Sequence, residues 1–252
     1  MKSETARGGG IEARISYSRL GYGVYYVRLH VVRDGRAVYD ARVLPYSSKW
    51  RGNQPLGAAT QARSITLRDL DADGEPEILV DFFTGGAHCC IWTRIYRWDD
   101  ARSTYTNLRH WFGDPGYRLV DLGGDGSFEL LSADDRFAYA FASYAASGMP
   151  VQVWSYRGGR LVDVTRDHRR LLARDATQQW GYFRQSKRQH RELRGALAAW
   201  AADECTLGRG KAALAWLQAH GPELRKVDPL YGDAVAFVRS LARFLARAGY
   251  RC

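Results

Sequence analysis

A short acidic segment that contains glycine occurs twice in this chain, and each copy leads into an apolar run typical of a buried strand. The first copy spans residues 68–79 and the second spans residues 120–131, an offset of 52 residues. Recurrence of one pattern at a fixed offset is typical of architectures built from repeated units. This repeat constrains the fold more than any other feature, because both copies are expected to occupy equivalent places in similar β-units.

The first two thirds of the sequence alternates between apolar and polar residues in the manner of strands. Residues 11–45 alternate in this way around an Asp-Gly pair at 34–35, which favours a tight hairpin turn. A glycine pair at 158–159 predicts another hairpin. Residues 11–164 are thus expected to form about three antiparallel units, each of the size of a propeller blade. Further strands are expected at residues 78–83, 89–98, 130–132, 137–143, 151–156 and 160–164.

The periodicity changes after residue 164, where apolar residues recur at helical spacing. Thr165 is a suitable N-cap for the first helical segment, and Gly249 is a suitable C-cap for the last. Helices are expected at residues 165–202, 211–219 and 231–248. The sequence therefore predicts an α+β protein with a flexible arm at 1–10, an antiparallel β-repeat domain at 11–164 and a small helical subdomain at 165–252.

Composition argues against a membrane span and shows where the positive charge lies. The chain has 252 residues, of which 46% are hydrophobic. No apolar run approaches the roughly 20 residues that a membrane helix requires. Residues 1–10 lack the apolar stretch of a signal peptide.

Residues 160–252 hold most of the net charge of +10, with 18 basic against 9 acidic side chains. A basic surface of this kind can bind nucleic acid, anionic lipid or acidic glycans.

The first acidic segment has the ligand spacing of a calcium-binding loop. Asp69, Asp71 and Asp73 stand at alternate positions before a glycine, and Glu77 follows shortly after them. Clustered carboxylates repel one another unless a hard divalent cation neutralises them, and Ca²⁺ takes about six to eight oxygen ligands. A helical EF-hand is disfavoured, because its twelfth position, normally a bidentate Glu, falls on Val80. The segment therefore predicts a calcium site in a loop that precedes a strand.

Both acidic segments resemble the loops of the FG-GAP and VCBS repeat proteins, an integrin-like β-propeller family whose blades carry a D-x-D-x-D-G-x-x-D/E loop before a strand. The resemblance is confined to the repeat region. Three units are too few to close a propeller ring, so the sheets stack openly, the helices fill the gap, or the fold is not a propeller. The resemblance implies that Ca²⁺ is bound by side-chain oxygens of Asp69, Asp71, Asp73 and Glu77 and by the backbone carbonyl of Glu75.

The second segment departs from the family pattern. Gly123 stands where the family has a carboxylate, which leaves Asp121, Asp125 and Glu129 as the ligands that the resemblance implies. Metal is therefore less strongly indicated here than in the first segment. The alternative is that its Asp-Gly pair only makes a turn.

The four cysteines are an even set, which favours disulfides and export from the cytoplasm. A Cys205–Cys252 bridge is favoured, because it would tether the end of a helix to the chain terminus.

Cys89 and Cys90 would then form a vicinal bridge or stay free. With His88 they make a candidate functional loop for a soft metal or a nucleophile. Adjacent strand residues point to opposite faces, which disfavours shared metal ligation. The expected location is secreted, periplasmic or cell surface, where calcium is abundant.

The sequence predicts a calcium-binding β-repeat protein that acts as a binding or structural module, with an extracellular protein or a glycan as the candidate partner. It contains no nucleophile elbow, zinc-protease motif or phosphate-binding glycine loop. Two alternatives stay open. One is a secreted hydrolase of glycans or other polymers that uses Asp81, Asp114, Asp134 and Asp135 or the loop around His88. The other is a binder of anionic polymers that uses the basic residues Arg169, Arg170, Arg174, Lys187, Arg188 and Arg191.

Overall fold

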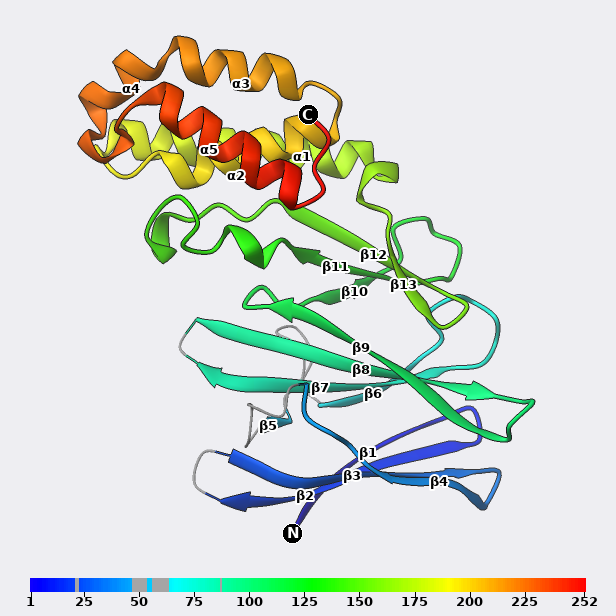
Figure 1. Cartoon of the computed structure of the whole chain (residues 1–252). Coiled ribbons are helices and arrows are strands. Elements are labelled where there is room, and N and C mark those ends of the chain that lie inside the picture. The colour runs from blue at the N-terminus through cyan, green and yellow to red at the C-terminus, as the bar shows by residue number, and fades with distance from the viewer. Residues whose placement is uncertain (21–22, 47–53, 56–63, 87) are drawn as a thin grey trace. The chain divides into compact units, whose positions relative to one another are not determined.

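The computed structural model describes residues 1–20, 23–46, 54–55, 64–86 and 88–252 (Figure 1). The predicted α+β class is confirmed, because strands form the N-terminal part and α-helices follow in the C-terminal part. Strand gives way to helix close to residue 164, as expected. The chain divides into two compact units, however, at other points. The first unit contains Met1–Ser132 and Trp154–Val162, and the second contains Ala133–Val153 and Asp163–Cys252.

The first sheet is a four-stranded antiparallel meander in the first unit. The hairpin turn predicted at residues 34–35 is confirmed between its last two strands, where Asp34 and Gly35 have φ of 48° and 77°. Positive φ at both central residues is typical of a two-residue hairpin turn. The strands in order are β1 (Lys2–Gly8), β2 (Ile11–Leu20), β3 (Gly23–Arg33) and β4 (Arg36–Arg42).

The N-terminal residues form an edge strand, so the flexible arm predicted at residues 1–10 is wrong. Strand β1 pairs with β2 along its whole length. Ala6 is buried, and the Glu4 carboxylate accepts a hydrogen bond from the Tyr17 hydroxyl at 2.8 Å. Backbone pairing with a neighbouring strand orders a polar segment that has no apolar periodicity of its own. The sequence pattern therefore did not indicate this strand.

The second sheet carries the first acidic loop. It confirms the strands predicted at 78–83 and 89–98, and its residues share one core with those of the first sheet, including Ile15, Leu29, Ile78, Val80 and Trp92. Strands β7, β8 and β9 form an antiparallel meander, and β5 and β6 both pair with β7. The strands are β5 (Gln54–Pro55), β6 (Ile65–Arg68), β7 (Glu77–Gly86), β8 (Cys89–Asp99) and β9 (Thr104–Gly113).

The third sheet carries the second acidic loop and confirms the strands predicted at 130–132, 151–156 and 160–164. Its order is β10 (Arg118–Val120), β11 (Glu129–Ala133), β12 (Val151–Arg157) and β13 (Arg160–Asp163). The β-region thus consists of blade-sized antiparallel sheets, as expected. The described residues form no closed barrel or propeller.

The strand predicted at residues 137–143 is wrong. A 3₁₀ turn, η1 (Asp135–Phe137), is followed by irregular chain and a second 3₁₀ turn, η2 (Tyr144–Ala146). The Asp134 side chain caps η1 by accepting a hydrogen bond from the backbone N–H of Arg136, and Phe137 is buried in the core of the helical region. A local cap and the burial of one aromatic ring therefore override the alternating pattern.

The helical part of the second unit is built around α2, whose residues Leu197, Ala198 and Ala201 are fully buried. The single helical segment predicted at 165–202 is two helices, because the chain turns at His190, which has φ of 51°. Two 3₁₀ turns, η3 (Thr165–Asp167) and η4 (Pro229–Tyr231), precede α1 and α5. The α-helices are α1 (Arg169–Arg188), α2 (Arg194–Thr206), α3 (Gly210–Ala219), α4 (Gly221–Val227) and α5 (Ala234–Arg247).

The predicted disulfide between Cys205 and Cys252 is confirmed. It tethers the last turn of α2 to the residues that follow α5. The C-cap predicted at Gly249 is consistent with its φ of 87°, and α5 ends two residues before it. Helix α4 was not expected from the sequence, since its seven residues are too few to show a clear period.

Candidate metal site

The loop between β6 and β7 brings three carboxylates together. Asp69, Asp71 and Glu77 each offer one oxygen atom, and these three atoms lie within 4.8 Å of one another. Strands β6 and β7 pair up to the residues that flank the loop, which fixes its two ends. Ala72 and Gly74, with φ of 55° and 89°, let the chain turn back within a few residues. The site predicted from the first acidic segment therefore has a compact set of hard oxygen ligands.

Each of the three residues has a buried oxygen with no hydrogen-bond partner in the described part of the chain. These atoms are Asp69 Oδ1, Asp71 Oδ1 and Glu77 Oε1. Glu77 is fully buried, and its other oxygen accepts a hydrogen bond from the backbone N–H of Leu70 at 3.1 Å. A buried polar atom without a partner costs about 1–3 kcal/mol, and more when it is charged. The residues present therefore fit a site that a cation completes.

Burial and crowding raise the pKa values of two carboxyl groups in this loop. Burial raises the pKa of Glu77 to about 8, against the opposing effect of the Leu70 N–H, and the nearby aspartates add to the rise. Burial and the charge of Asp73 raise the pKa of Asp71. Both shifts mean that the charged forms lack sufficient counter-charge from the protein. A divalent cation would supply that charge.

Two of the expected ligand residues direct their side chains elsewhere. Asp73 Oδ2 lies 3.4 Å from Nη2 of Arg97 on β8, so Asp73 is not one of the three convergent carboxylates. Glu75 forms a two-bond ion pair with Arg33 of β3, in which Oε2 lies 2.6 Å from Nη2. Glu75 was expected to ligate through its backbone carbonyl, which this ion pair does not engage. Both basic partners come from distant strands, so the local spacing gave no signal of them.

The second acidic loop, between β10 and β11, repeats the hydrogen bonds of the first. The Glu129 carboxylate accepts a hydrogen bond from the N–H of Leu122 at 3.0 Å. The Asp121 carboxylate accepts one from the N–H of Gly126 at 3.1 Å. In the first loop the equivalent bonds join the residues 52 positions earlier, at 3.1 and 2.9 Å. The internal repeat seen in the sequence is therefore a repeat of structure.

The second loop lacks one carboxylate of the first. Gly123 stands at the position equivalent to Asp71, and within the described ranges the convergent group of three ligand oxygens is that of the first loop. Asp125 Oδ1 accepts hydrogen bonds from the N–H and the hydroxyl of Ser127 at 3.0 and 2.6 Å, which lower the pKa of Asp125. The ligands expected in this loop, Asp121, Asp125 and Glu129, thus serve the turn through hydrogen bonds.

Two other segments of the first unit lie against the first loop. The backbone N–H of Phe128, in the second acidic loop, donates a hydrogen bond to the Leu70 carbonyl at 2.9 Å. The backbone of Gly158, in the turn between β12 and β13, lies close enough to the Asp71 carboxylate to oppose the rise in its pKa. The three-carboxylate cluster therefore lies where three turns of the first unit come together.

The loop around His88 is described only in part. His88 is exposed, and Cys90 is buried and disulfide-bonded, with its N–H donating to Thr84 Oγ1 at 3.0 Å. The side chain of Cys89 and all of residue 87 lie outside the described residues. A disulfide-bonded Cys90 is neither a thiolate ligand nor a nucleophile.

Two of the carboxylates considered for hydrolysis are held in separate hydrogen-bond networks. Asp81, in the first unit, is fully buried, and its Oδ1 accepts hydrogen bonds from the hydroxyls of Thr93 and Tyr117 at 2.6 and 2.9 Å. Asp134, in the second unit, is buried against Arg136 and Tyr250 and accepts hydrogen bonds from both. These contacts give both carboxylates structural roles.

The basic residues considered for polymer binding lie on α1 and just after it. Lys187 forms an ion pair with Glu223, and Arg169 donates a hydrogen bond to the Leu207 carbonyl at 3.3 Å. The other four are exposed and form no ion pair with any described residue. They are Arg170, Arg174, Arg188 and Arg191.

No protein-family model matches the chain. Its curated relatives include an uncharacterised protein, y4bJ, of Sinorhizobium fredii (strain NBRC 101917 / NGR234), which is 32% identical over 209 residues, covering 81% of this chain and 31% of that protein. A probable thylakoid lumen protein, sll0997, of Synechocystis sp. (strain ATCC 27184 / PCC 6803 / Kazusa) is 31% identical over 155 residues, covering 57% of this chain and 44% of that protein. The chain thus spans less than half the length of these relatives.

Among solved structures, a Xanthomonas type IV secretion system related protein matches 64% of this chain and 92% of its own, with 14% identity and a TM-score of 0.27. A similarity this low carries no argument about fold or function. None of the helices in the described ranges has the length and apolar composition needed to cross a bilayer.

Proposed function

We propose that this chain binds a calcium ion in the β6–β7 loop, that the ion stabilises the β-sheet region, and that the protein acts as an extracytoplasmic binding or structural module. The observation that carries this proposal is the convergence of three carboxylate oxygens within 4.8 Å, together with the buried, unpartnered Oε1 of Glu77. Carboxylate oxygens favour hard cations over soft transition metals. Ca²⁺ accepts irregular arrangements of oxygen ligands, whereas Mg²⁺ demands a near-ideal octahedron and retains its waters, so Ca²⁺ is the better match for three carboxylates from one loop.

The proposed role of the ion is structural. Bound between Asp69, Asp71 and Glu77, it would offset the repulsion among their charges and hold the loop that joins β6 to β7. The turns at Phe128 and Gly158 contact the same loop, so the ion would also stabilise their arrangement. The resemblance of both acidic loops to FG-GAP and VCBS repeats supports this role.

The proposed location is outside the cytoplasm. One relative is named as a probable thylakoid lumen protein. The thylakoid lumen is a compartment separated from the cytoplasm. The Cys205–Cys252 disulfide supports the same proposal, because disulfides persist in oxidising compartments. Weak calcium sites with dissociation constants of about 10⁻⁴–10⁻³ M are also typical of extracellular modules. The secreted, periplasmic or cell-surface location expected from the sequence is consistent with all three.

The test is thermal unfolding of the chain in calcium and in EDTA. At a calcium concentration about tenfold above the dissociation constant, the expected stabilisation is about 1.4 kcal/mol. For a chain of this size that gain corresponds to a rise in melting temperature of about 3–6 °C. Asp71→Asn removes one converging carboxylate and is expected to abolish the gain.

The matched control is Asp125→Asn, which makes the same change in the second acidic loop. This control is expected to keep the calcium response of the wild type, because Asp125 is committed to Ser127. Identical melting of the wild type in calcium and in EDTA would refute the proposal. A response that Asp71→Asn retains in full would place the ion elsewhere.

A further inference from the structure

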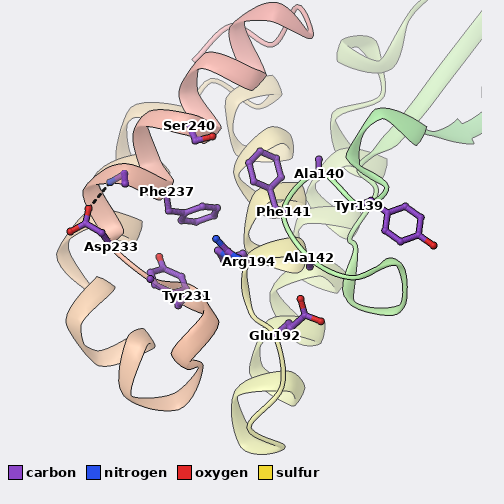
Figure 2. A pocket seen from close by; sticks show the side chains of 12 residues that line it. Tyr139, Ala140, Phe141, Ala142, Glu192, Arg194, Tyr231, Asp233, Phe237 and Ser240 are labelled. Atoms are coloured by element: carbon purple, nitrogen blue, oxygen red, sulfur yellow. Dashed lines mark hydrogen bonds between the residues drawn. The ribbon is translucent and has the colours of Figure 1, made fainter.

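A cavity of about 500 Å³ lies within the second unit, in a region that the sequence did not single out (Figure 2). Three separate segments line it: the irregular chain at 139–142, the start of α2, and the stretch from η4 into α5. Its volume is within the range of about 300–1,000 Å³ that is typical of small-molecule sites. The cavity is unrelated to the calcium loop, which belongs to the first unit.

One partly buried aromatic ring, Phe141, offers apolar surface to this cavity and rests on buried rings behind it. Tyr231 and Phe237 are buried, and their ring centroids lie 5.3 Å apart. The ring of Phe141 faces that of Phe237 from the opposite segment, edge to face, with centroids 5.8 Å apart. These contacts hold the ring of Phe141 in place, and its uncovered part is a surface on which a flat apolar group can pack.

Tyr139 stands at the rim of the cavity in an unusual backbone conformation. Its φ is 60°, in the left-handed region, and the residue is 60% exposed. A bulky side chain is strained in this region, because its Cβ crowds the following carbonyl oxygen. Backbone strain of this kind clusters at ligand sites, where the surrounding structure maintains it.

The charged groups of the cavity differ in how far the protein already uses them. Glu192 accepts hydrogen bonds with both oxygens, from the N–H and the hydroxyl of Ser143 at 2.9 and 2.5 Å. Asp233 caps α5 by accepting a hydrogen bond from the N–H of Ala236 at 2.7 Å, drawn as a dashed line in Figure 2. Both carboxylates therefore serve the local backbone.

Arg194 is the charged group of the cavity whose side chain makes no hydrogen bond to the local backbone that the structure describes. Among the described residues its guanidinium donates no hydrogen bond and forms no ion pair. Its side chain points into the space between α5 and the segment 139–142 (Figure 2). Arg194 is also the first residue of α2, a helix with no side-chain N-cap and no acidic residue in its first turn. The positive end of the helix dipole therefore adds to the charge of the guanidinium.

We propose that this cavity binds a small ligand that carries a carboxylate next to an aromatic group, with the carboxylate on Arg194 and the aromatic group against the partly buried ring of Phe141. The planar guanidinium pairs with a carboxylate through two parallel hydrogen bonds, and the ring of Phe141 supplies apolar contact area. A free aromatic acid and the C-terminal residue of a peptide share this chemistry. The proposal is independent of calcium binding.

The test compares probes that share a phenyl ring and differ in charge, using NMR titration of the whole chain. N-acetylphenylalanine is the probe, and N-acetylphenylalanine amide is its neutral match. Phenethylamine presents the same ring with a positive charge. The acid is expected to bind at least about tenfold more tightly than the amide, because only the acid forms a charge-assisted pair with the guanidinium. Equal binding of acid and amide, or tighter binding of the amine, would overturn the proposal.

Variants of the cavity locate the binding. Arg194→Gln is expected to remove the preference for the acid, and Arg194→Lys to retain part of it. Arg191→Gln is the matched control, because it removes the same charge from an exposed residue three positions away. Ser240→Trp, on the exposed side of α5, is expected to fill the cavity and to weaken binding of acid and amide alike. Unchanged acid binding in both Arg194→Gln and Ser240→Trp would also refute the site.

Titration with a short peptide identifies the source of the carboxylate. Gly-Gly-Gly-Phe with a free C-terminus is compared with N-acetylphenylalanine. Tighter binding of the peptide supports the proposal with a peptide C-terminus as the ligand. Tighter or equal binding of N-acetylphenylalanine supports it with a free aromatic acid as the ligand.

Discussion

Glu77 is the residue on which the proposed calcium site depends most, because it is fully buried and one of its oxygens has no partner among the described residues. Burial raises its pKa from 4.5 to about 8 in the metal-free protein. Between these two values the folded chain holds a proton that the unfolded chain has released. Metal-free stability therefore falls as pH rises through this window, since the folded state binds more protons. Calcium would reverse the loss by stabilising the charged form.

Glu77→Gln tests this linkage, because the amide keeps the shape of the carboxyl group and cannot ionise. In EDTA at pH 8 the variant is expected to be more stable than the wild type, by about 1–3 kcal/mol, while at pH 5 the two differ little. The variant is also expected to gain no stability from calcium. Urea unfolding at both pH values measures these differences, with Glu129→Gln as the equivalent change in the second loop. A calcium gain that survives Glu77→Gln would show that Glu77 is not a ligand.

At the scale of single residues, the sequence indicated the converging set Asp69, Asp71 and Glu77 through local spacing alone. It could not indicate that Asp73 turns to Arg97 or that Glu75 pairs with Arg33, because both basic residues lie on other strands. Arg194 was missed for the same reason: its significance comes from the ring of Phe141, which belongs to a distant segment. Local patterns predict contacts within a loop, and tertiary partners decide the rest.

At the scale of elements, the two acidic loops are built alike and differ in one position. Gly123, which replaces the carboxylate of Asp71, does not have the positive φ of its neighbours Gly124 and Gly126. A side chain is therefore compatible with the backbone at this position. A Cβ there would lie 3.3 Å from the Asp125 carboxylate, which needs only a small shift.

Gly123→Asp is expected to convert the second loop into a three-carboxylate site. Calorimetric titration of the variant should show two bound calcium ions for each chain where the wild type binds one. In EDTA the variant is expected to be less stable than the wild type, because the added charge repels Asp121 and Asp125. Gly123→Asn provides the neutral control. A folded variant that still binds one ion would contradict the idea that this carboxylate limits binding in the second loop.

Sequence-based prediction of helices, strands and turns succeeded where neighbouring residues specify the element, and it failed where contacts with distant segments decide it. The hairpin at 34–35 and the strands around each acidic loop were predicted, because turn residues and alternation specify them directly. The strand predicted at 137–143 failed, since Asp134 caps a 3₁₀ turn there and Phe137 packs among the helices. Strand β1 was missed because its order comes from pairing with β2.

At the scale of the whole molecule, the sequence predicted a change from strand to helix near residue 164 but not the division into compact units. The predicted boundary and the observed division differ because β12 contributes residues 151–153 to the second unit and residues 154–157 to the first. The segment 133–150, placed in the β-region by its alternation, belongs to the helical unit. Periodicity reports local conformation, whereas the units are defined by long-range contacts that it does not encode.

The two units contain different stabilising features and are therefore expected to respond to different perturbations. The proposed calcium loop belongs to the first unit, and the Cys205–Cys252 bridge, with a sequence separation of 47, belongs to the second. The chain-entropy account gives a bridge of this length about 4 kcal/mol. Calorimetry is expected to resolve two transitions, of which calcium raises one and the Cys205→Ala, Cys252→Ser double variant lowers the other. A single transition that both perturbations shift would mean that the units unfold together, because β12 couples them.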